Sequence, residues 1–268
     1  MRKRSLVLLL SGIGLCNAAH SDETPATTTN PDDTWALRAV AGFSKTTGNT
    51  DTTTGNGQFR VAHVVDSWKF LFGMQGLYGA TKGETTAQDY GVEFQTNYNF
   101  TDRLYWFGGL NYDNNKFSGF AYQEMLNTGA GYQFVQTDAT KLSGQIGVGV
   151  QRLRPETYLT DPTGGIISGS VVEQDTTSDV IGTGAINFEH SFNKSTKLLA
   201  SVAVQSGSAN TMTTAGAGLQ VKMSDRLSLT AAYQLVHNSK PPVGIDGSSG
   251  LTTLNLVYEL KNPKLAPQ

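Results

Sequence analysis

The side chains best suited to acid–base chemistry are the four histidines, His20, His63, His190 and His237. A hydrolase of the serine type needs a nucleophile, a base and an orienting group within hydrogen-bond reach of one another. No Ser-His or Asp-His pair in the sequence suggests such a site, and the histidines are far apart along the chain. The favoured interpretation is that the protein is not an enzyme, and no catalytic residue is assigned. A constellation assembled in space from distant segments stays open as the alternative.

Three acidic residues are the best candidates for a metal site. Asp161, Glu173 and Asp175 could supply oxygen ligands for Ca²⁺, but their spacing matches no recognised calcium loop. Solvated charge is the favoured interpretation, and neither a metal nor a cofactor is expected. The one cysteine, Cys16, lies in a segment that we expect to be cleaved, so the mature chain is expected to have no thiol for disulfides or catalysis.

Stretches of alternating apolar and polar residues run from Trp35 to Leu260, and turn residues separate them. Such alternation is typical of a β-strand with one apolar face. The prolines all fall outside these stretches, which supports the assignment because proline interrupts a hydrogen-bond ladder. The expected strands are 35–46, 54–64, 67–80, 90–100, 104–114, 122–135, 141–152, 177–192, 197–206, 211–223, 227–237 and 249–260.

The connections between these strands alternate in length. Tight turns are expected at 65–67, 101–103, 137–140, 193–196 and 224–226, and longer loops at 48–53, 83–87, 117–121, 155–174, 207–210 and 238–248. Short periplasmic turns, longer external loops and an even strand number are the rule in outer-membrane barrels. The sequence therefore predicts an all-β fold, a single transmembrane antiparallel up-and-down β-barrel of about 12 strands. The similar segments 101–104 and 224–227 are interpreted as repeated turn chemistry.

Aromatic residues indicate which face meets lipid. On the apolar face they gather near both ends of the strands, whereas small or aliphatic residues such as Ala39, Gly108 and Val148 occupy the middle. Two aromatic bands are typical of the interfacial girdles of a membrane barrel. A soluble lipocalin-like barrel, the alternative, would spread aromatic residues through its core. The same alternation places His63, His190 and His237 on the outward face near the rims.

The polar face is then expected to line the lumen, where amides dominate. No ring of one sign is visible among the charged residues, so the sequence does not predict a strongly ion-selective filter. A lumen filled by hydrogen-bonded side chains is favoured, and an open channel is the alternative. The charged lumen residues assigned by parity are Arg38, Arg60, Lys69, Glu93, Asp113, Glu189, Lys222 and Glu259.

The N-terminal segment predicts the cellular location of the protein. Basic residues at 2–4 and a short apolar core precede Ala18 and Ala19, small residues that suit a signal peptidase. A lipoprotein signal centred on Cys16 is disfavoured because Leu15 is large. The expected organisation is a cleaved signal peptide (1–19), a flexible periplasmic leader (20–33), the outer-membrane barrel (34–260) and a periplasmic C-terminal tail (261–268).

The expected location is the outer membrane of a Gram-negative cell. The net charge of −2 gives no basic footprint for nucleic acid. The expected partners are outer-membrane lipid or lipopolysaccharide and, during biogenesis, the barrel-assembly machinery. The sequence carries no signal of oligomeric state.

Several segments resemble one family. They are 40–52 with its Gly-Asn-Thr-Asp run, 83–87, 100–105 with Phe-Thr-Asp-Arg-Leu-Tyr, 116–120 and the glycine-rich 126–132. The resemblance is to the bacterial salt-induced outer membrane protein family, YdiY-like, also called domain-of-unknown-function family 481. It covers most of the mature chain and implies an outer-membrane barrel of unassigned activity with a link to salt response. The long loop at 155–174 and the tail beyond Leu260 depart from the usual pattern of such barrels.

The sequence therefore predicts an integral outer-membrane β-barrel protein of unassigned molecular activity. It is expected to be structural or a narrow, plugged, weakly selective pore, and to be linked to salt or envelope stress. The alternatives are an outer-membrane enzyme and a protein that binds a ligand through its surface loops.

Overall fold

The computed structural model describes residues 34–46, 52–81, 84–115, 120–160, 166–173, 175–208, 210–241 and 247–261. The predicted signal peptide, the leader with His20, residues 262–268 of the predicted tail and Asp161 lie outside these ranges. Among the described residues there is no helix long and apolar enough to cross a bilayer. The strands are β1 (Thr34–Thr46), β2 (Thr52–Val65), β3 (Trp68–Thr81), β4 (Glu84–Asn99), β5 (Leu104–Asn115), β6 (Phe120–Gln136), β7 (Thr140–Thr160), β8 (Ile166–Glu173), β9 (Thr177–Ser191), β10 (Thr196–Gly207), β11 (Thr211–Lys222), β12 (Leu227–Asn238) and β13 (Ser248–Lys261).

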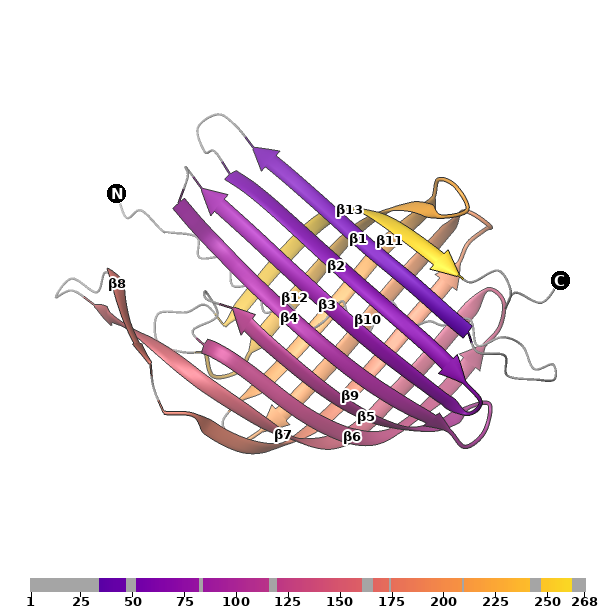
Figure 1. Cartoon of the computed structure of the whole chain (residues 1–268), viewed down its shortest axis with the longest axis horizontal. Coiled ribbons are helices and arrows are strands. Elements are labelled where there is room, and N and C mark those ends of the chain that lie inside the picture. The colour runs from indigo at the N-terminus through magenta and orange to yellow at the C-terminus, as the bar shows by residue number, and fades with distance from the viewer. Residues whose placement is uncertain are drawn as a thin grey trace.

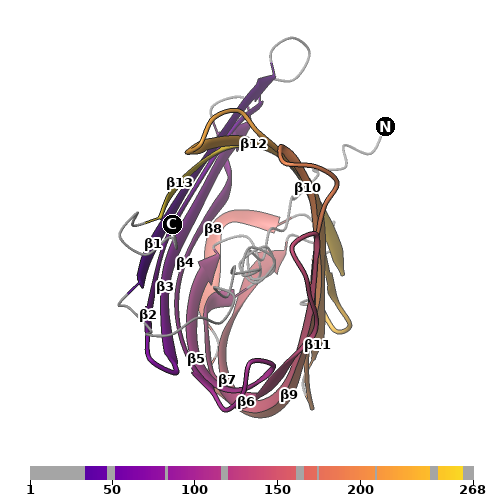
Figure 2. The same cartoon turned by 90° about the vertical axis from the view of Figure 1, so that its right-hand side faces the viewer.

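The strands other than β8 form a closed antiparallel barrel, which confirms the predicted fold (Figure 1). Each strand pairs with its neighbour along the chain, β7 pairs directly with β9, and β13 closes the barrel against β1. The outline is flattened, with β1 to β4 along one side and β10 and β11 along the other (Figure 2). Opposite walls of the lumen therefore lie close together.

The predicted loop at 155–174 is wrong in part, because most of it is strand. β7 continues to Thr160, and β8 pairs with this extension outside the barrel ladder. Pro155, expected in a loop, lies within β7 opposite Phe120. Leu153 is the last β7 residue paired with β9, and Glu156 is the first paired with β8. On the side of β7 that faces β9 and β8, Pro155 therefore falls between two ladders, where proline is tolerated.

Burial alternates along the strands and separates an inner face from an outer face. On β12, Ser228, Thr230 and Gln234 are buried, whereas Tyr233 and Leu235 are exposed. Large apolar side chains stay exposed on the outer faces of most barrel strands. A soluble protein rarely exposes so large an apolar surface, whereas a membrane barrel presents it to lipid.

Aromatic side chains contact one another on the outer face near the tight turns. Trp68 on β3 lies edge-on to Tyr98 on β4, with ring centroids 4.9 Å apart. Trp35 on β1 stacks on His63 of β2 at 4.1 Å. Aromatic rings with a polar edge suit the level of the lipid headgroups.

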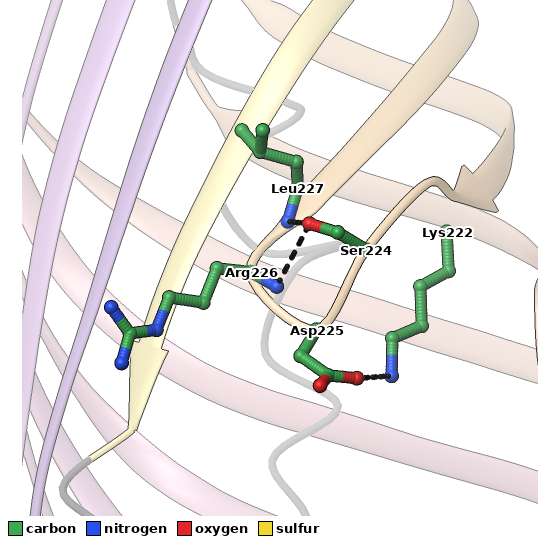
Figure 3. Close-up of polar contacts among 5 residues, drawn as sticks. All are labelled: Lys222, Ser224, Asp225, Arg226 and Leu227. Atoms are coloured by element: carbon green, nitrogen blue, oxygen red, sulfur yellow. Dashed lines mark hydrogen bonds and ion pairs between the residues drawn. The ribbon is translucent and has the colours of Figure 1, made fainter.

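Four tight turns share one hydrogen-bond pattern. Each begins with a short polar side chain that accepts a hydrogen bond from the backbone N–H three residues later: Thr101 from Leu104, Thr137 from Thr140, Asn193 from Thr196 and Ser224 from Leu227. Figure 3 shows the Ser224 turn, where the N–H groups of Arg226 and Leu227 both point at Ser224 Oγ. Such side chains replace a backbone acceptor and fix the turn.

The fifth tight turn, between β2 and β3, is shorter. It leaves only Asp66 and Ser67 between the strands, and Asp66 has a φ of 52°. This left-handed conformation is one that aspartate tolerates better than most residues.

We expect Ser224→Ala to lower the free energy of unfolding by about 0.5–1.5 kcal/mol, because the N–H groups of the turn lose their acceptor. Thr137→Ser, which keeps a hydroxyl, is the matched control and should leave stability unchanged. Urea titration of the folded barrel in detergent, followed by tryptophan fluorescence, measures both. Equal midpoints for Ser224→Ala and wild type would contradict the assigned role of the hydroxyl.

Candidate functional site in the barrel lumen

An inward-facing glycine allows an ion pair to form between side chains two strands apart. Gly73 on β3 pairs with Arg60 on β2 and with Glu93 on β4. The Arg60 Nε atom lies 2.9 Å from Glu93 Oε1, and the side chains are only 5% and 15% exposed. A Cβ at Gly73 would lie 2.7 Å from Glu93 Cγ, closer than real Cβ contacts allow. The ion pair therefore depends on the missing side chain at Gly73.

The same arrangement occurs between β1, β2 and β13. Gly42 pairs with Asn56 on one side and Asn255 on the other. The Asn56 side-chain amide donates a 3.0 Å hydrogen bond to Asn255 Oδ1. A Cβ at Gly42 would contact both amide oxygens. These two side chains thus bond directly in front of the glycine and fill the lumen there.

A third inward-facing glycine, Gly131 on β6, lets an aromatic side chain fill the lumen beside it. Gly131 pairs with Tyr105 on β5 and with Gln145 on β7, and Gln145 Nε2 donates a 3.0 Å hydrogen bond to the Tyr105 hydroxyl. The Tyr105 ring lies directly over Gly131, and the Phe107 ring lies over Gly129. Both rings are buried. Side chains rather than solvent therefore occupy this part of the lumen.

Charged side chains gather on the inner face in the half of the barrel nearer the tight turns. Besides Arg60–Glu93, Arg38 Nη1 lies 3.4 Å from Glu259 Oε1, and Lys197 Nζ lies 3.5 Å from Glu189 Oε1. We call this set the charged layer. It consists of Arg38, Arg60, Lys69, Glu93, Lys141, Glu189, Lys197 and Glu259.

The half of the lumen nearer the long loops is acidic. Asp89 and Asp113 are both buried and lie within hydrogen-bonding range of each other. Asp179 accepts a 2.9 Å hydrogen bond from the Ser208 hydroxyl. By parity along their strands, these three carboxyl groups face inward in this half. Charge is thus separated along the barrel axis.

The charged residues predicted to line the lumen take three positions. Arg38, Arg60, Lys69, Glu93, Glu189 and Glu259 belong to the charged layer. Asp113 lies in the acidic half. Lys222 lies exposed at the rim, where its Nζ atom is 3.1 Å from Asp225 Oδ1 (Figure 3).

Sequence reasoning missed four charged lumen residues, Asp89, Lys141, Asp179 and Lys197. Asp89 was excluded because the predicted strand began at Tyr90, whereas β4 begins at Glu84. The other three share the inward parity of their strands. Parity combined with the distance of each residue from its tight turn would have shown the axial separation of charge.

An internal cavity of about 110 Å³ lies between the two flattened walls. Its lining joins β1 to β4 with β10 to β13 and runs from Arg38 to Asp89. Gln58, Gln75 and Gln234 contribute amides, and aliphatic side chains contribute the rest of the surface. The cavity therefore has polar groups of several kinds but little volume.

The histidines make cross-strand contacts on the outer face. His190 Nδ1 lies 2.8 Å from the hydroxyl of Thr140, and His237 Nδ1 lies 2.8 Å from that of Ser248. Each hydroxyl belongs to the residue directly opposite in the ladder. The structure thus creates a Ser–His pair that the sequence did not indicate. The Thr140–His190 pair at the other rim has the same arrangement, which favours a structural role for both pairs.

No three His, Cys, Asp or Glu side chains group closely enough to hold a metal ion within the described part of the chain. Of the residues considered for calcium, Asp175 is exposed to solvent. The backbone of Glu173 lies in β8, opposite Glu156.

Comparison with known proteins gives the family. The family described as "Protein of unknown function, DUF481" matches residues 39–260, which run from β1 to β13. The chain belongs to this family. The match confirms the resemblance to domain-of-unknown-function family 481. No curated protein is similar enough to count as a relative of this DUF481 chain.

Solved structures similar to this DUF481 chain are outer-membrane barrels. The NanC porin has 12% sequence identity and a TM-score of 0.44, covering 84% of this chain and 97% of the porin. The β domain of the Bordetella autotransporter BrkA has 12% identity and a TM-score of 0.43, covering 85% and 98%. The KdgM porin, in complex with disordered oligogalacturonate, has 10% identity and a TM-score of 0.39, covering 83% and 98%. These likenesses concern the fold alone.

We expect Gly73→Ala to destabilise the barrel and to separate Arg60 from Glu93, because the new Cβ would occupy the space of the Glu93 side chain. Overpacking of this kind costs about 1–3 kcal/mol. Gly55→Ala on β2 is the matched control, since a Cβ there meets nothing within 4 Å. Urea midpoints of the two variants give the comparison. Equal stabilities would show that Gly73 is not needed as a gap.

We expect Arg60→Met to cost about 3–5 kcal/mol, because it leaves the Glu93 carboxylate in the lumen without this guanidinium. The double variant Arg60→Met/Glu93→Gln should cost less than Arg60→Met alone, since no buried charge remains at the pair. A double-mutant cycle from chemical denaturation measures the coupling. Strictly additive effects would contradict a coupled pair.

Proposed function

We propose that this DUF481 barrel is a narrow, weakly selective pore whose lumen is filled by its own side chains. The observation that carries the proposal is the set of glycine-bridged pairs and ion pairs that cross the lumen and leave a cavity of about 110 Å³ beside Arg38. A more open hollow of about 500 Å³ adjoins this cavity at Asn56 and Asp89. The resemblance to salt-induced proteins supports a role under salt or envelope stress as part of this proposal.

The size of the cavity limits what could pass. A water molecule takes about 30 Å³ of liquid volume, and pockets for drug-sized ligands measure about 300–1,000 Å³. The narrow cavity beside Arg38 suits a few water molecules or one small ion with part of its hydration shell, and it limits passage more than the adjoining open hollow of about 500 Å³. A sugar or a nucleotide would need the walls to move apart, and the bridging hydrogen bonds oppose that movement.

Both signs of charge in the lumen support weak selectivity. Strong selectivity needs a ring of one sign at the constriction, whereas the charged layer contains both signs and three of its cations pair with its carboxylates. The proposal assigns no catalysis to the three described histidines, because His190 and His237 each bond to the hydroxyl opposite and His63 stacks on a tryptophan.

Planar-bilayer recording of the refolded mature barrel tests this proposal. We expect small conductance steps from wild type and severalfold larger steps from Arg60→Ala/Glu93→Ala, because the double variant removes two long side chains from the constriction. Lys222→Ala at the exposed rim is the matched control and should conduct like wild type. Heat-modifiable gel migration establishes that each barrel is folded before recording.

Three results would contradict the narrow pore. Wild type that passes disaccharides in a liposome-swelling assay would show an open channel. Equal conductance of wild type and Arg60→Ala/Glu93→Ala would show that the pair does not restrict flow. Silence from both folded barrels would favour a purely structural protein.

A further inference from the structure

Two buried polar side chains on β12 line the internal cavity and have polar atoms without partners there. Thr230 and Gln234 are 6% and 5% exposed, and both contribute to the wall of the cavity of about 110 Å³. Within the described part of the chain, Thr230 Oγ1 and Gln234 Nε2 are buried and make no hydrogen bond. Buried polar groups are nearly always hydrogen-bonded, so these two atoms indicate that a molecule in the cavity is their partner.

The strand register explains why the wall gives Gln234 no partner. The residues directly opposite it are Gly216 on β11 and Leu251 on β13. Glycine has no side chain and leucine has no polar one, so neither neighbour can accept a hydrogen bond from the amide. All three residues line the cavity, so the Gln234 amide lies at its surface.

The neighbours of Thr230 are polar but do not bond to its hydroxyl. Asn255, opposite Thr230 on β13, accepts a hydrogen bond from Asn56 and donates one to Thr253. On β11 the opposite residue is Gln220, whose buried Oε1 atom also makes no hydrogen bond to a described residue. The Thr230 hydroxyl is therefore available to a ligand in the cavity.

The charges on the cavity wall favour an uncharged ligand. Arg38 and Asp89 both line the cavity and have opposite signs. An anion would be repelled by Asp89 and a cation by Arg38, so an ion of either sign gains little net attraction. Arg38 Nη1 already lies 3.4 Å from Glu259 Oε1, whereas Arg38 Nε is buried and makes no hydrogen bond in the described ranges. It is a further N–H donor at the cavity.

We propose that this cavity binds a small uncharged polyol, of the size of ethylene glycol or glycerol, through Thr230, Gln234 and Arg38 Nε. This inference deepens the proposed function and rests on it, because the same cavity limits passage through the lumen. An apolar cavity of about 150 Å³ holds benzene, so about 110 Å³ suits a ligand of roughly four to six non-hydrogen atoms. A hydroxyl group both donates and accepts, so one polyol can bond to a hydroxyl, an amide and a guanidinium N–H. Aliphatic residues of the wall, such as Val40 and Leu77, suit its carbon chain.

Protection of a thiol on the cavity wall tests the site. Thr253→Cys places that thiol, and a small methanethiosulfonate reagent modifies it in the folded mature barrel in detergent. We expect glycerol to slow the reaction saturably, with a half-maximal effect at roughly millimolar concentration. Lys222→Cys at the exposed rim is the matched control, and its rate should not saturate with glycerol. If the buried thiol does not react, saturation-transfer NMR from the folded barrel to glycerol provides the same comparison.

Removal of the unpartnered polar groups should weaken binding without weakening the fold. In Thr230→Val/Gln234→Leu the half-maximal glycerol concentration should rise tenfold or more. Without glycerol, the urea midpoint of this variant should be unchanged or higher, because the replaced atoms have no protein partner to lose. Ser228→Ala, a buried change on β12 outside the cavity lining, is the matched control and should bind glycerol like wild type. Gln234→Leu alone serves if the double variant does not fold.

Four results would overturn the inference. Absence of saturable protection by glycerol in the folded barrel would mean that water alone meets these polar atoms. Equal protection by 1-propanol, which has the same three-carbon chain but one hydroxyl, would show apolar binding. Unchanged glycerol binding in folded Thr230→Val/Gln234→Leu would place the ligand elsewhere. A lowered urea midpoint in that variant would show that the two groups serve the fold.

The binding assay needs no ion flow, so it fails separately from the proposed function. A barrel that binds glycerol yet passes disaccharides overturns only the narrow pore. A barrel that conducts weakly but binds no glycerol overturns only the polyol site.

Discussion

The lumen of this barrel depends on one packing constraint, the absence of a side chain at particular inward-facing positions. A residue on one strand cannot reach a residue two strands away if a side chain stands between them. Gly42 and Gly73 remove that obstacle, and Asn56 bonds to Asn255 while Arg60 pairs with Glu93 across the gaps. Buried polar groups need partners, and these bridges supply partners that a nearest-neighbour ladder would not.

The charged layer follows from the same constraint. Charges in a narrow, partly dry lumen are tolerated only where opposite charges lie within reach. Arg60 meets Glu93 over a glycine, whereas Arg38 meets Glu259 directly across the β1–β13 seam. Closure of the barrel therefore completes the electrostatic network as well as the hydrogen-bond ladder.

The alternation of residue types was enough to predict the barrel, because each strand has one lipid-facing side and one lumen-facing side. β12 shows this most clearly, since its burial alternates along almost its entire length. The β7 extension and β8 could not be predicted in the same way. In the sequence, Pro155 indicates the end of a strand. It is accommodated because the partner of β7 on one side changes from β9 to β8 at that point.

The lumen itself was only partly predictable. Parity along a strand gives the side that a residue faces, but its depth depends on the register between strands. The axial separation of the acidic residues from the charged layer depends on that register. The bridging role of Gly73 is also invisible in one sequence, because its neighbours Arg60 and Glu93 are distant along the chain.

The central claim is that side chains fill the lumen, and thiol accessibility tests it most directly. Thr253→Cys places a thiol on the cavity wall, and Lys222→Cys places one at the exposed rim. Each variant would be treated with thiol reagents of increasing size in detergent micelles, where both mouths of the barrel meet solvent. The expected result is that Lys222→Cys reacts with every reagent and Thr253→Cys reacts only with the smallest. Equal reaction of both thiols with the largest reagent would contradict a filled lumen.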